Sequence, residues 1–172
     1  MPQLIKNGAL VEDGWTLQRD ALPLGSALPT ANAIVPLAFW LANREELRAR
    51  GDVGVWLAPA DDPALLAADT ATLPVIAVDF PKFADGRGYS IGRLLRERHG
   101  YQGELRAVGD IQRDQLYSLH QVGFDAFVLR EGSHPQSALS SLRDFSDGYQ
   151  LTNRRTPWFR RSGVVPETGS NP

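Results

Sequence analysis

The sequence predicts an α/β fold of about five repeated strand–helix (βα) units with a mostly parallel sheet, preceded by an N-terminal β-hairpin. From Asn32 onward, short apolar runs alternate with amphipathic segments. Short loops join these segments, which favours right-handed parallel crossovers. About five strands fit either a flavodoxin-like sheet or an open partial barrel, because a complete eight-fold barrel needs about 250 residues.

Residues 1–20 are predicted to form the hairpin. The stretch from Leu4 to Gln18 alternates apolar and polar residues around Asn7-Gly8 and Asp13-Gly14. Both dipeptides are strong turn signals, because Asn or Asp followed by Gly accommodates positive φ. We therefore expect a hairpin or a small meander, followed by a connecting loop over residues 22–30.

The βα units follow over residues 32–147. The first three predicted strands are Ala33–Val35, Val53–Leu57 and Leu73–Val78, separated by a helix from Pro36 to Arg50 and a short helix capped by Asp62. Glycine and proline punctuate these segments, as they do at helix ends and starts.

The last two units have clear helix signals. Ser90 is predicted to cap a helix over Ile91–His99, the strand Leu105–Val108 follows, Asp110 caps a helix over Ile111–Val122, and the strand Phe124–Leu129 precedes a final helix from Ser133 or His134 to Phe145. Short polar side chains at these starts can accept hydrogen bonds from the first helical N–H groups.

Residues 1–150 are therefore expected to form a single domain, and residues 151–172 a C-terminal extension with a mobile end. Trp158-Phe159-Arg160-Arg161 places two rings in a polar segment. Exposed rings need a surface that receives them. Two surfaces stay open: the domain itself, or a partner or second copy of the chain.

Composition limits the function classes. The 172 residues are 42% apolar and 22% charged, as in one globular domain. A formal net charge of −2 gives no basic excess for nucleic acid. Neither a membrane-spanning apolar stretch nor a signal peptide is visible, so we expect a cytoplasmic protein without membrane contact.

The chain has no cysteine. Disulfides, a thiolate nucleophile and Cys-ligated zinc or iron–sulfur clusters are therefore excluded. We predict no cofactor and no metal. The three histidines suggest no Ser-His-Asp arrangement.

The functional surface is expected at the carboxyl ends of the strands, where ligands bind in parallel α/β sheets. Asp79, Lys82 and Asp110 are candidate catalytic residues there. Asp79, Asp110 and Glu131 could together supply oxygen ligands to Mg²⁺. The alternative is structural, with Asp79 paired to Lys82 or Arg106 and Asp110 acting as a helix cap.

The segment 85–90 is a glycine-containing loop that leads into a helix. Exposed N–H groups, the helix dipole and arginines would favour a small anion there. The predicted anion-binding residues are Gly86, Arg87, Gly88, Ser90 and Arg93. The alternative is a simple turn in which Arg87 pairs with Asp85. In the next strand, Glu104 and Arg106 either line a wet face or form cross-strand ion pairs.

Several of these segments resemble one family. They are Val35-Pro36-Leu37, Val55–Pro59, Asp79–Phe83, Asp85–Ser90, Arg93–Arg98, Gly103–Asp110, Gly123–Asp125 and Phe159–Arg161. The chain is similar, from about Asn32 to Arg161, to an uncharacterised bacterial family labelled as oxidoreductases of sulfite reduction, whose genes lie beside assimilatory sulfite reductase.

The resemblance implies a metabolic context. It suggests an accessory protein of assimilatory sulfite and sulfate reduction, either a small-anion binder or a partner of sulfite reductase or another sulfur-assimilation protein. An alternative is an enzyme that acts on a small anionic substrate at the strand ends, with Asp79 as base and Arg87 as anion clamp. A purely structural or regulatory module is a third possibility, and an oligomer is compatible with all three.

Overall fold

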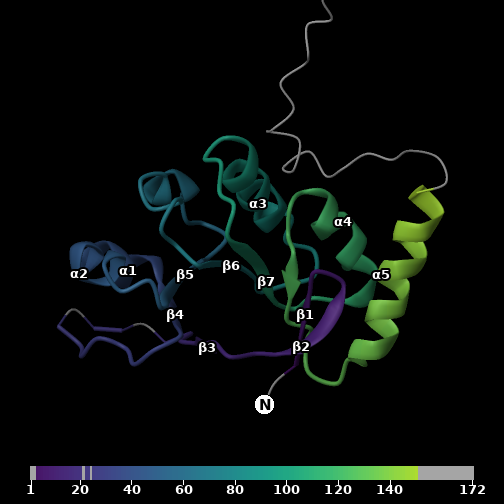
Figure 1. The fold of residues 1–172 in the computed structure, drawn as a ribbon, viewed down its shortest axis with the longest axis horizontal. Coiled ribbons are helices and arrows are strands. Elements are labelled where there is room, and N and C mark those ends of the chain that lie inside the picture. The colour runs from purple at the N-terminus through teal and green to yellow at the C-terminus, as the bar shows by residue number, and fades with distance from the viewer. Residues whose placement is uncertain (1–2, 21, 24, 151–172) are drawn as a thin grey trace, which may run out of the picture.

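The computed structural model describes residues 3–20, 22–23 and 25–150. Within this part of the chain, the strands form one sheet in the order β2-β1-β8-β7-β6-β5-β4-β3 (Figure 1). The strands are β1 (Gln3–Lys6), β2 (Ala9–Glu12), β3 (Thr16–Leu17), β4 (Ala33–Pro36), β5 (Val53–Leu57), β6 (Val75–Phe80), β7 (Glu104–Gly109) and β8 (Ala126–Phe127).

Helical segments connect the later strands. They are α1 (Leu37–Ala42), α2 (Arg44–Arg48), the 3₁₀ turn η1 (Pro63–Leu66), α3 (Arg87–Glu97), the 3₁₀ turn η2 (Arg113–Gln115), α4 (Leu116–Gln121) and α5 (Pro135–Gln150). Among the helices that the structure describes, none has the length and apolar character needed to cross a membrane.

The sheet is mostly parallel, as predicted. Strands β4 to β8 lie side by side in chain order, and each is parallel to the next. Only β1 runs against its neighbours, β2 and β8. The flavodoxin-like alternative is wrong, because a doubly wound sheet reverses its strand order and carries helices on both faces. The five βα units are also less regular than predicted, because the connection between β5 and β6 contains only the 3₁₀ turn η1 and no α-helix.

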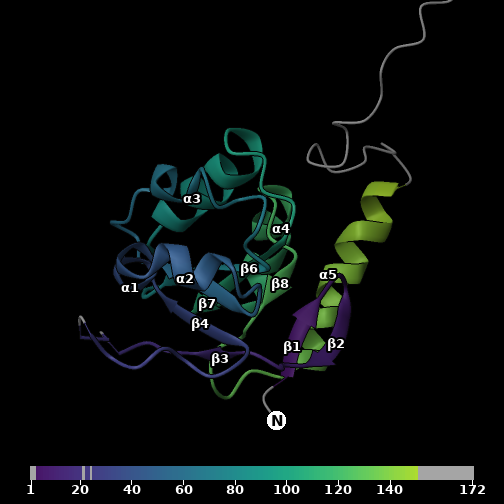
Figure 2. The ribbon, with the colours of Figure 1, turned by 60° about the vertical axis from the view of Figure 1, so that its left-hand side comes forward.

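All the described helices pack on one face of the sheet (Figures 1 and 2). The main core joins sheet residues such as Val55, Ile76 and Leu105 to helix residues such as Trp40 and Leu95. The opposite, concave face has a small apolar cluster instead, made of Ile34, Val75, Ala77 and Val108, with Trp15, Leu17, Trp56 and Val128 packed against it. No helical residue belongs to that second cluster.

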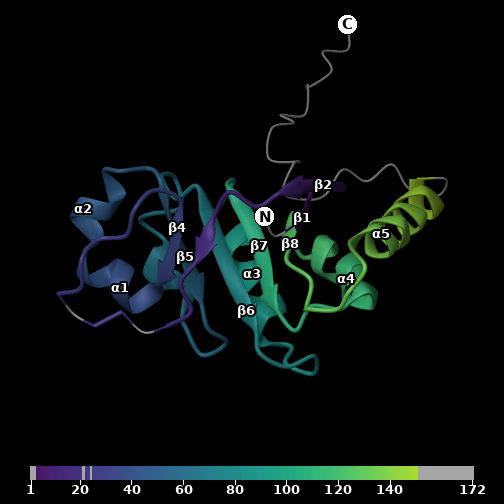
Figure 3. The same ribbon diagram turned by 90° about the horizontal axis from the view of Figure 1, so that it is seen from below.

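The sheet curls into a half-barrel. Strands β2 and β3 lie at opposite edges of the sheet, yet only residues 13–15 separate them along the chain. Four backbone steps, from Glu12 to Thr16, span at most about 14 Å. The two edges must therefore approach each other, which a flat eight-stranded sheet does not allow. Figure 3 shows this segment running from β2 across the sheet toward β4.

We call residues 13–19 the strap. The predicted turn at Asp13-Gly14 is wrong as a hairpin, because β3 pairs in parallel with β4 and not with β2. An Asp13 carboxylate oxygen instead accepts a hydrogen bond from the Trp15 N–H, and the carboxylate forms an ion pair with Arg106. The Asn7-Gly8 hairpin is present, with φ of 50° at Asn7 and 76° at Gly8, and it joins β1 to β2.

Several element boundaries differ from the prediction. The helix expected from Pro36 to Arg50 is divided at Asn43, whose side-chain amide donates to the Phe39 carbonyl oxygen. Strand β6 extends through Asp79 to Phe80, because β7 offers partners along its whole length. Strand β8 is limited to Ala126–Phe127, shorter than the predicted Phe124–Leu129.

Two predicted helix caps are wrong. Helix α3 begins at Arg87, so Ser90 lies within the helix and is no cap. Asp110 does not cap the next helix either. There Gln112 and Gln115 form a reciprocal capping box at η2, and Gln115 Oε1 accepts from the Gln112 N–H at 3.0 Å. A box of two glutamines is harder to recognise than a capping Ser or Asp.

The C-terminal extension, residues 151–172, lies outside the described residues. The expectations for Trp158-Phe159-Arg160-Arg161 and for a mobile end therefore stay predictions. Helix α5 extends through Gln150, beyond the predicted end at Phe145.

Candidate functional site

The carboxyl ends of the parallel strands bring together only part of the predicted site. Asp110, directly after β7, lies near Arg130, beyond β8, with 3.7 Å between Oδ1 and Nη1. Asp79 is one residue before the end of β6, but it points to the concave face. Its Oδ1 accepts from Arg19 Nη1 at 3.0 Å.

Asp79 is thus a buried, paired carboxylate. Its side chain is 12% exposed, and its partner is neither of the expected cations, Lys82 or Arg106. Arg19 belongs to the strap, 60 residues earlier in the chain. No local sequence signal could identify that pair, because it depends on how the strap crosses the concave face.

Lys82 and Asp110 are associated with the loop after β6. Lys82 is exposed, and its backbone carbonyl accepts from the Asp85 N–H at 3.0 Å. Asp110 Oδ2 accepts from the Phe83 N–H at 3.2 Å. Asp110 therefore holds this loop beside β7. No interaction joins it to Asp79, so the three candidate catalytic residues do not form one cluster.

The predicted anion-binding loop contains its own anion. Asp85 accepts from the Arg87 backbone N–H at 3.1 Å, and from Arg87 Nε and Nη2 at 3.0 and 2.8 Å. The Arg87 guanidinium, through these hydrogen bonds, lowers the pKa of Asp85 from 3.8 to about 2. A carboxylate thus lies at the N-terminus of α3, where an external anion was expected.

The remaining residues of that predicted site are dispersed. Gly86 precedes the first turn of α3, whereas Gly88 is buried against the ring of Phe80. Ser90 is exposed on the helix, and Arg93 forms an ion pair with Glu97 at 3.0 Å, one turn later. Whether an external anion competes with Asp85 for Arg87 stays a prediction.

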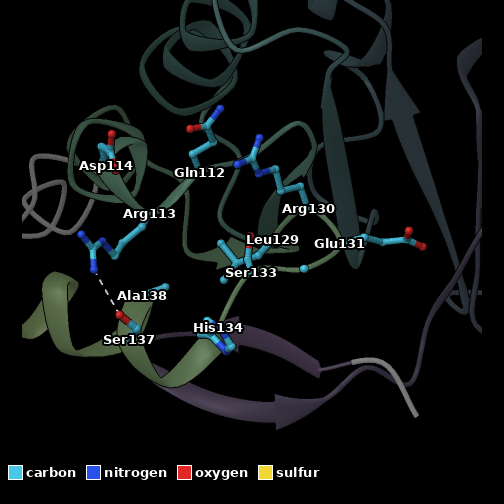
Figure 4. A pocket seen from close by; sticks show the side chains of 11 residues that line it. Gln112, Arg113, Asp114, Leu129, Arg130, Glu131, Ser133, His134, Ser137 and Ala138 are labelled. Carbon is cyan, nitrogen blue, oxygen red and sulfur yellow. Dashed lines mark hydrogen bonds between the residues drawn. The ribbon is translucent and has the colours of Figure 1, made fainter.

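The predicted alternative of a Mg²⁺ site at the strand ends can be compared with the positions of its three carboxylates. Within the described ranges, no group of three or more His, Asp or Glu side chains is placed to hold a metal ion. Asp79 pairs with Arg19, and Asp110 lies near Arg130. Glu131 is exposed and points away from the other labelled side chains in Figure 4.

A pocket of about 390 Å³ lies at the carboxyl end of β8 (Figure 4). It is formed where the β8–α5 loop, η2 and the first turn of α5 meet. The lining residues are Gln112, Arg113, Asp114, Leu129, Arg130, Glu131, Gly132, Ser133, His134, Ser137 and Ala138. The pocket lies at a strand end, as the fold class predicted, but next to β8 and not next to β6, where the anion-binding loop was predicted.

The pocket lining combines two arginines and two hydroxyl groups with the carboxylates of Asp114 and Glu131. Arg113 Nη1 donates to Ser137 Oγ at 3.1 Å, which connects η2 to α5. The Arg130 side chain is 55% exposed, and its distance to Asp110 is long for an ion pair. His134 immediately precedes α5, and Ser133 donates its N–H to the Arg130 carbonyl oxygen at 3.2 Å.

The start of α5 adds a partial positive charge. The first N–H groups of a helix have no partner within the helix, and the aligned peptide dipoles make that end favourable for anions. Pro135 at the first position has no N–H, so Gln136 and Ser137 supply the first free donors. The pocket can therefore receive a small oxyanion between Arg113, Arg130 and these donors.

Comparison with protein families gives one match. Residues 54–159, more than half of the chain, match the family described as "Bacterial protein of unknown function (DUF934)". This chain belongs to the DUF934 family. No curated protein matches it. The membership agrees with the uncharacterised bacterial family that the sequence resembles, at the level of an unknown function.

The DUF934 match contains the strand-end pocket but not the strap. All pocket residues lie between 112 and 138, within the matched segment, whereas residues 13–19 precede it. Sequence reasoning missed Arg113 and Ser137, because a 3₁₀ turn and a helix start bring them together across 24 residues. The available signal was Ser133-His134-Pro135, a helix start directly after the Arg130-Glu131 strand end.

Proposed function

We propose that this DUF934 protein is a cytoplasmic accessory protein of assimilatory sulfite and sulfate reduction that binds a small oxyanion. The single observation that carries the binding activity is the strand-end pocket, where Arg113 and Arg130 line the same cavity as the first turn of α5. Sulfite, sulfate and phosphate are the anions whose charge and size suit such donors.

The metabolic context has a separate support. It comes from the resemblance of segments such as Asp85–Ser90 and Gly103–Asp110 to a family labelled for sulfite reduction. The anion pocket and this context agree in chemistry, because the substrate and the oxidised precursor of that reaction are both oxyanions. Sulfite reductase, or another protein of sulfur assimilation, is the partner that we propose.

The enzyme alternative has less support. It needs a base close to the bound anion, and Asp79 lies on the concave face with Arg19, outside the pocket. Besides the two arginines, the titratable side chains that line the pocket are Asp114, Glu131 and His134, and Glu131 points away from the other labelled side chains in Figure 4. We therefore favour binding, and we keep turnover at His134 as the specific form that an enzymatic function would take.

The test is calorimetric titration with sulfite, sulfate and phosphate. Charge-assisted hydrogen bonds contribute about 1.5–3 kcal/mol each, so Arg130→Gln and Arg113→Gln should each weaken binding about tenfold or more. Arg87→Gln is the matched control for the loop before α3. Because Arg87 already has Asp85 as its partner, it should change affinity less than twofold.

Two results would contradict the pocket assignment. One is unchanged affinity in Arg113→Gln and Arg130→Gln. The other is a tenfold loss in Arg87→Gln, which would move the anion to the predicted loop over Gly86–Arg93. Co-purification of the tagged chain with sulfite reductase from the native host tests the proposed partner separately.

A further inference from the structure

The concave face of the half-barrel contains a second cavity, of about 470 Å³. It lies between the strap on one side and strands β7 and β8 on the other. Its lining residues are Asp13, Gly14, Trp15, Thr16, Leu17, Arg19, Arg106, Val108 and Val128. None of these residues lines the strand-end pocket, so the two cavities are separate sites.

Arg106 is the unusual member of this lining. Its side chain is 2% exposed. Nη1 donates to both carboxylate oxygens of Asp13, at 2.9 and 2.8 Å, and Nε donates to Glu104 Oε1 at 2.8 Å. Nη2 lies 2.7 Å from the same Glu104 oxygen, but it makes no hydrogen bond of acceptable geometry within the described residues.

A buried donor without an acceptor is rare in native proteins, because its lost hydration is not compensated. Nη2 carries two N–H groups, and its contact with Glu104 can occupy at most one of them. The other N–H is an indication that this cavity receives an acceptor oxygen. Val108 and Val128, which line the same cavity, offer no acceptor, so the acceptors beside Arg106 are those of Asp13 and Glu104.

A second cation lies close along the sheet. Arg106 pairs in register with Ala77, two residues before Asp79, and Asp79 holds Arg19. That contact uses Arg19 Nη1 alone, and the Arg19 side chain is 52% exposed. Its other N–H groups have no partner among the described residues. An acidic group in the cavity can therefore meet donors from both arginines.

Apart from Asp13, already paired with Arg106, and Thr16, the rest of the lining has no polar side chain and includes one large ring. Trp15, half-buried in the middle of the strap, packs with Leu17 against the cluster on the concave face. A flat molecule gains from contact with an indole ring and with valine side chains. A cavity of a few hundred cubic ångströms with few polar groups is also typical of small-molecule sites.

We infer that the concave face binds a flat apolar molecule that carries a carboxylate or sulfonate group. Arg106 and Arg19 hold the acidic group, and Trp15, Leu17, Val108 and Val128 surround the apolar body. This ligand differs in kind from a bare oxyanion, because its apolar part supplies much of the affinity.

The probe for this inference is 1-naphthoate, titrated by calorimetry into the full chain. We expect saturable binding, at least tenfold tighter than 1-naphthalenemethanol, which has a similar shape but no charge. Arg19→Gln and Trp15→Ala should each weaken naphthoate binding tenfold or more. Arg130→Gln, in the strand-end pocket, is the matched control and should leave it within twofold.

Val128→Phe keeps the contacts of the strap and fills the cavity. Val128→Phe should abolish naphthoate binding. It replaces Trp15→Ala as the test if thermal melting shows that Trp15→Ala destabilises the protein. The inference is overturned if naphthoate shows no saturable binding at millimolar concentration. It is equally overturned if Val128→Phe binds naphthoate as tightly as the wild type.

Discussion

At the scale of single residues, many of the charged side chains form ion pairs that connect elements of the fold. Asp69, fully buried, accepts from Trp40 Nε1 at 3.1 Å and pairs with Arg44 and Arg48. Burial opposes ionisation of this carboxyl, but the hydrogen bonds from Trp40 and Arg48 prevail and lower its pKa. A carboxylate paired in this way connects the turn after η1 to α1 and α2, so its role is structural.

Asp85 gives a pH-dependent prediction. Hydrogen bonds from Arg87 lower its pKa to about 2 in the folded chain. A carboxyl whose pKa is depressed by folding stabilises the native state above its ordinary pKa. That contribution is lost as the pH falls from about 4 through about 2. An NMR titration of the Asp85 carboxyl carbon should therefore have a midpoint near 2 in the wild type.

The control for this titration is Arg87→Gln, which removes the guanidinium and keeps the carboxyl. Its midpoint should return toward the ordinary value of 3.8. An unchanged midpoint in that variant would mean that Arg87 is not the cause of the shift, and Arg87 would then be available to an external anion.

Residue roles were predictable where both partners are close in the sequence. The Arg87–Asp85 pair, two residues apart, was one of two alternatives that the loop itself suggested. The partners of Asp79 and Arg106 were not predictable, because Arg19 and Asp13 are 60 and 93 residues away. Of the pocket residues, sequence reasoning singled out Glu131, Ser133 and His134 by their place at a strand end and a helix start.

At the scale of elements, α3 shows how glycine sets the distance between a helix and the sheet. Gly88 and Gly92 lie on the buried face of α3, against the rings of Phe80 and Phe124. A Cβ atom at either position would lie closer to the ring than van der Waals contact allows. The two glycines therefore allow α3 to lie directly on the rings of Phe80 and Phe124, which pack edge to face with centroids 5.8 Å apart.

Gly88→Ala should therefore destabilise the domain, by about 1–3 kcal/mol, because the helix or the Phe80 ring must move. Gly86→Ala is the matched control two residues earlier. A Cβ there meets nothing within 4 Å, and the backbone φ of −80° suits any residue. Urea denaturation followed by circular dichroism measures both free energies of unfolding. Equal stability of the two variants would contradict this account of the packing.

Element types were more predictable than their boundaries. The strands β4 to β7 were recognised as apolar runs, because parallel strands are buried on both faces. The start of α3 was misplaced by four residues, since the N-cap is Gly86 and not Ser90, and the Arg87 N–H donates to Asp85. In β6, the polar Asp79 concealed a strand that continues to Phe80.

At the scale of the whole molecule, the curl of the sheet decides what each face can do. The helices cover the convex face, and the strap crosses the concave one. Two ion pairs, Asp13–Arg106 and Arg19–Asp79, hold the strap at its two ends. No sequence pattern indicated this crossing, because Asp13-Gly14 has the composition of a hairpin turn. The mostly parallel sheet was predictable, and its closure by the strap was not.

The C-terminal extension supplies the last prediction. The family match continues to residue 159, nine residues past the end of α5, and so includes Trp158 and Phe159. A segment shared by a family in this way favours a common structural role over a species-specific contact. We therefore expect the two rings to dock on their own domain.

Truncation after Asn153 tests this expectation. If docking buries about 100 Å² of apolar area, it contributes about 2.5 kcal/mol. For a chain of this size, that loss corresponds to a melting temperature lower by about 5–10 °C.

Truncation after Arg161 is the control, because it removes only residues beyond the family match, and it should leave the melting temperature unchanged. If both truncations melt like the wild type while self-association or co-purification with sulfite reductase is lost only in the shorter chain, the rings contact a partner. If neither stability nor association changes, the aromatic pair has no structural role.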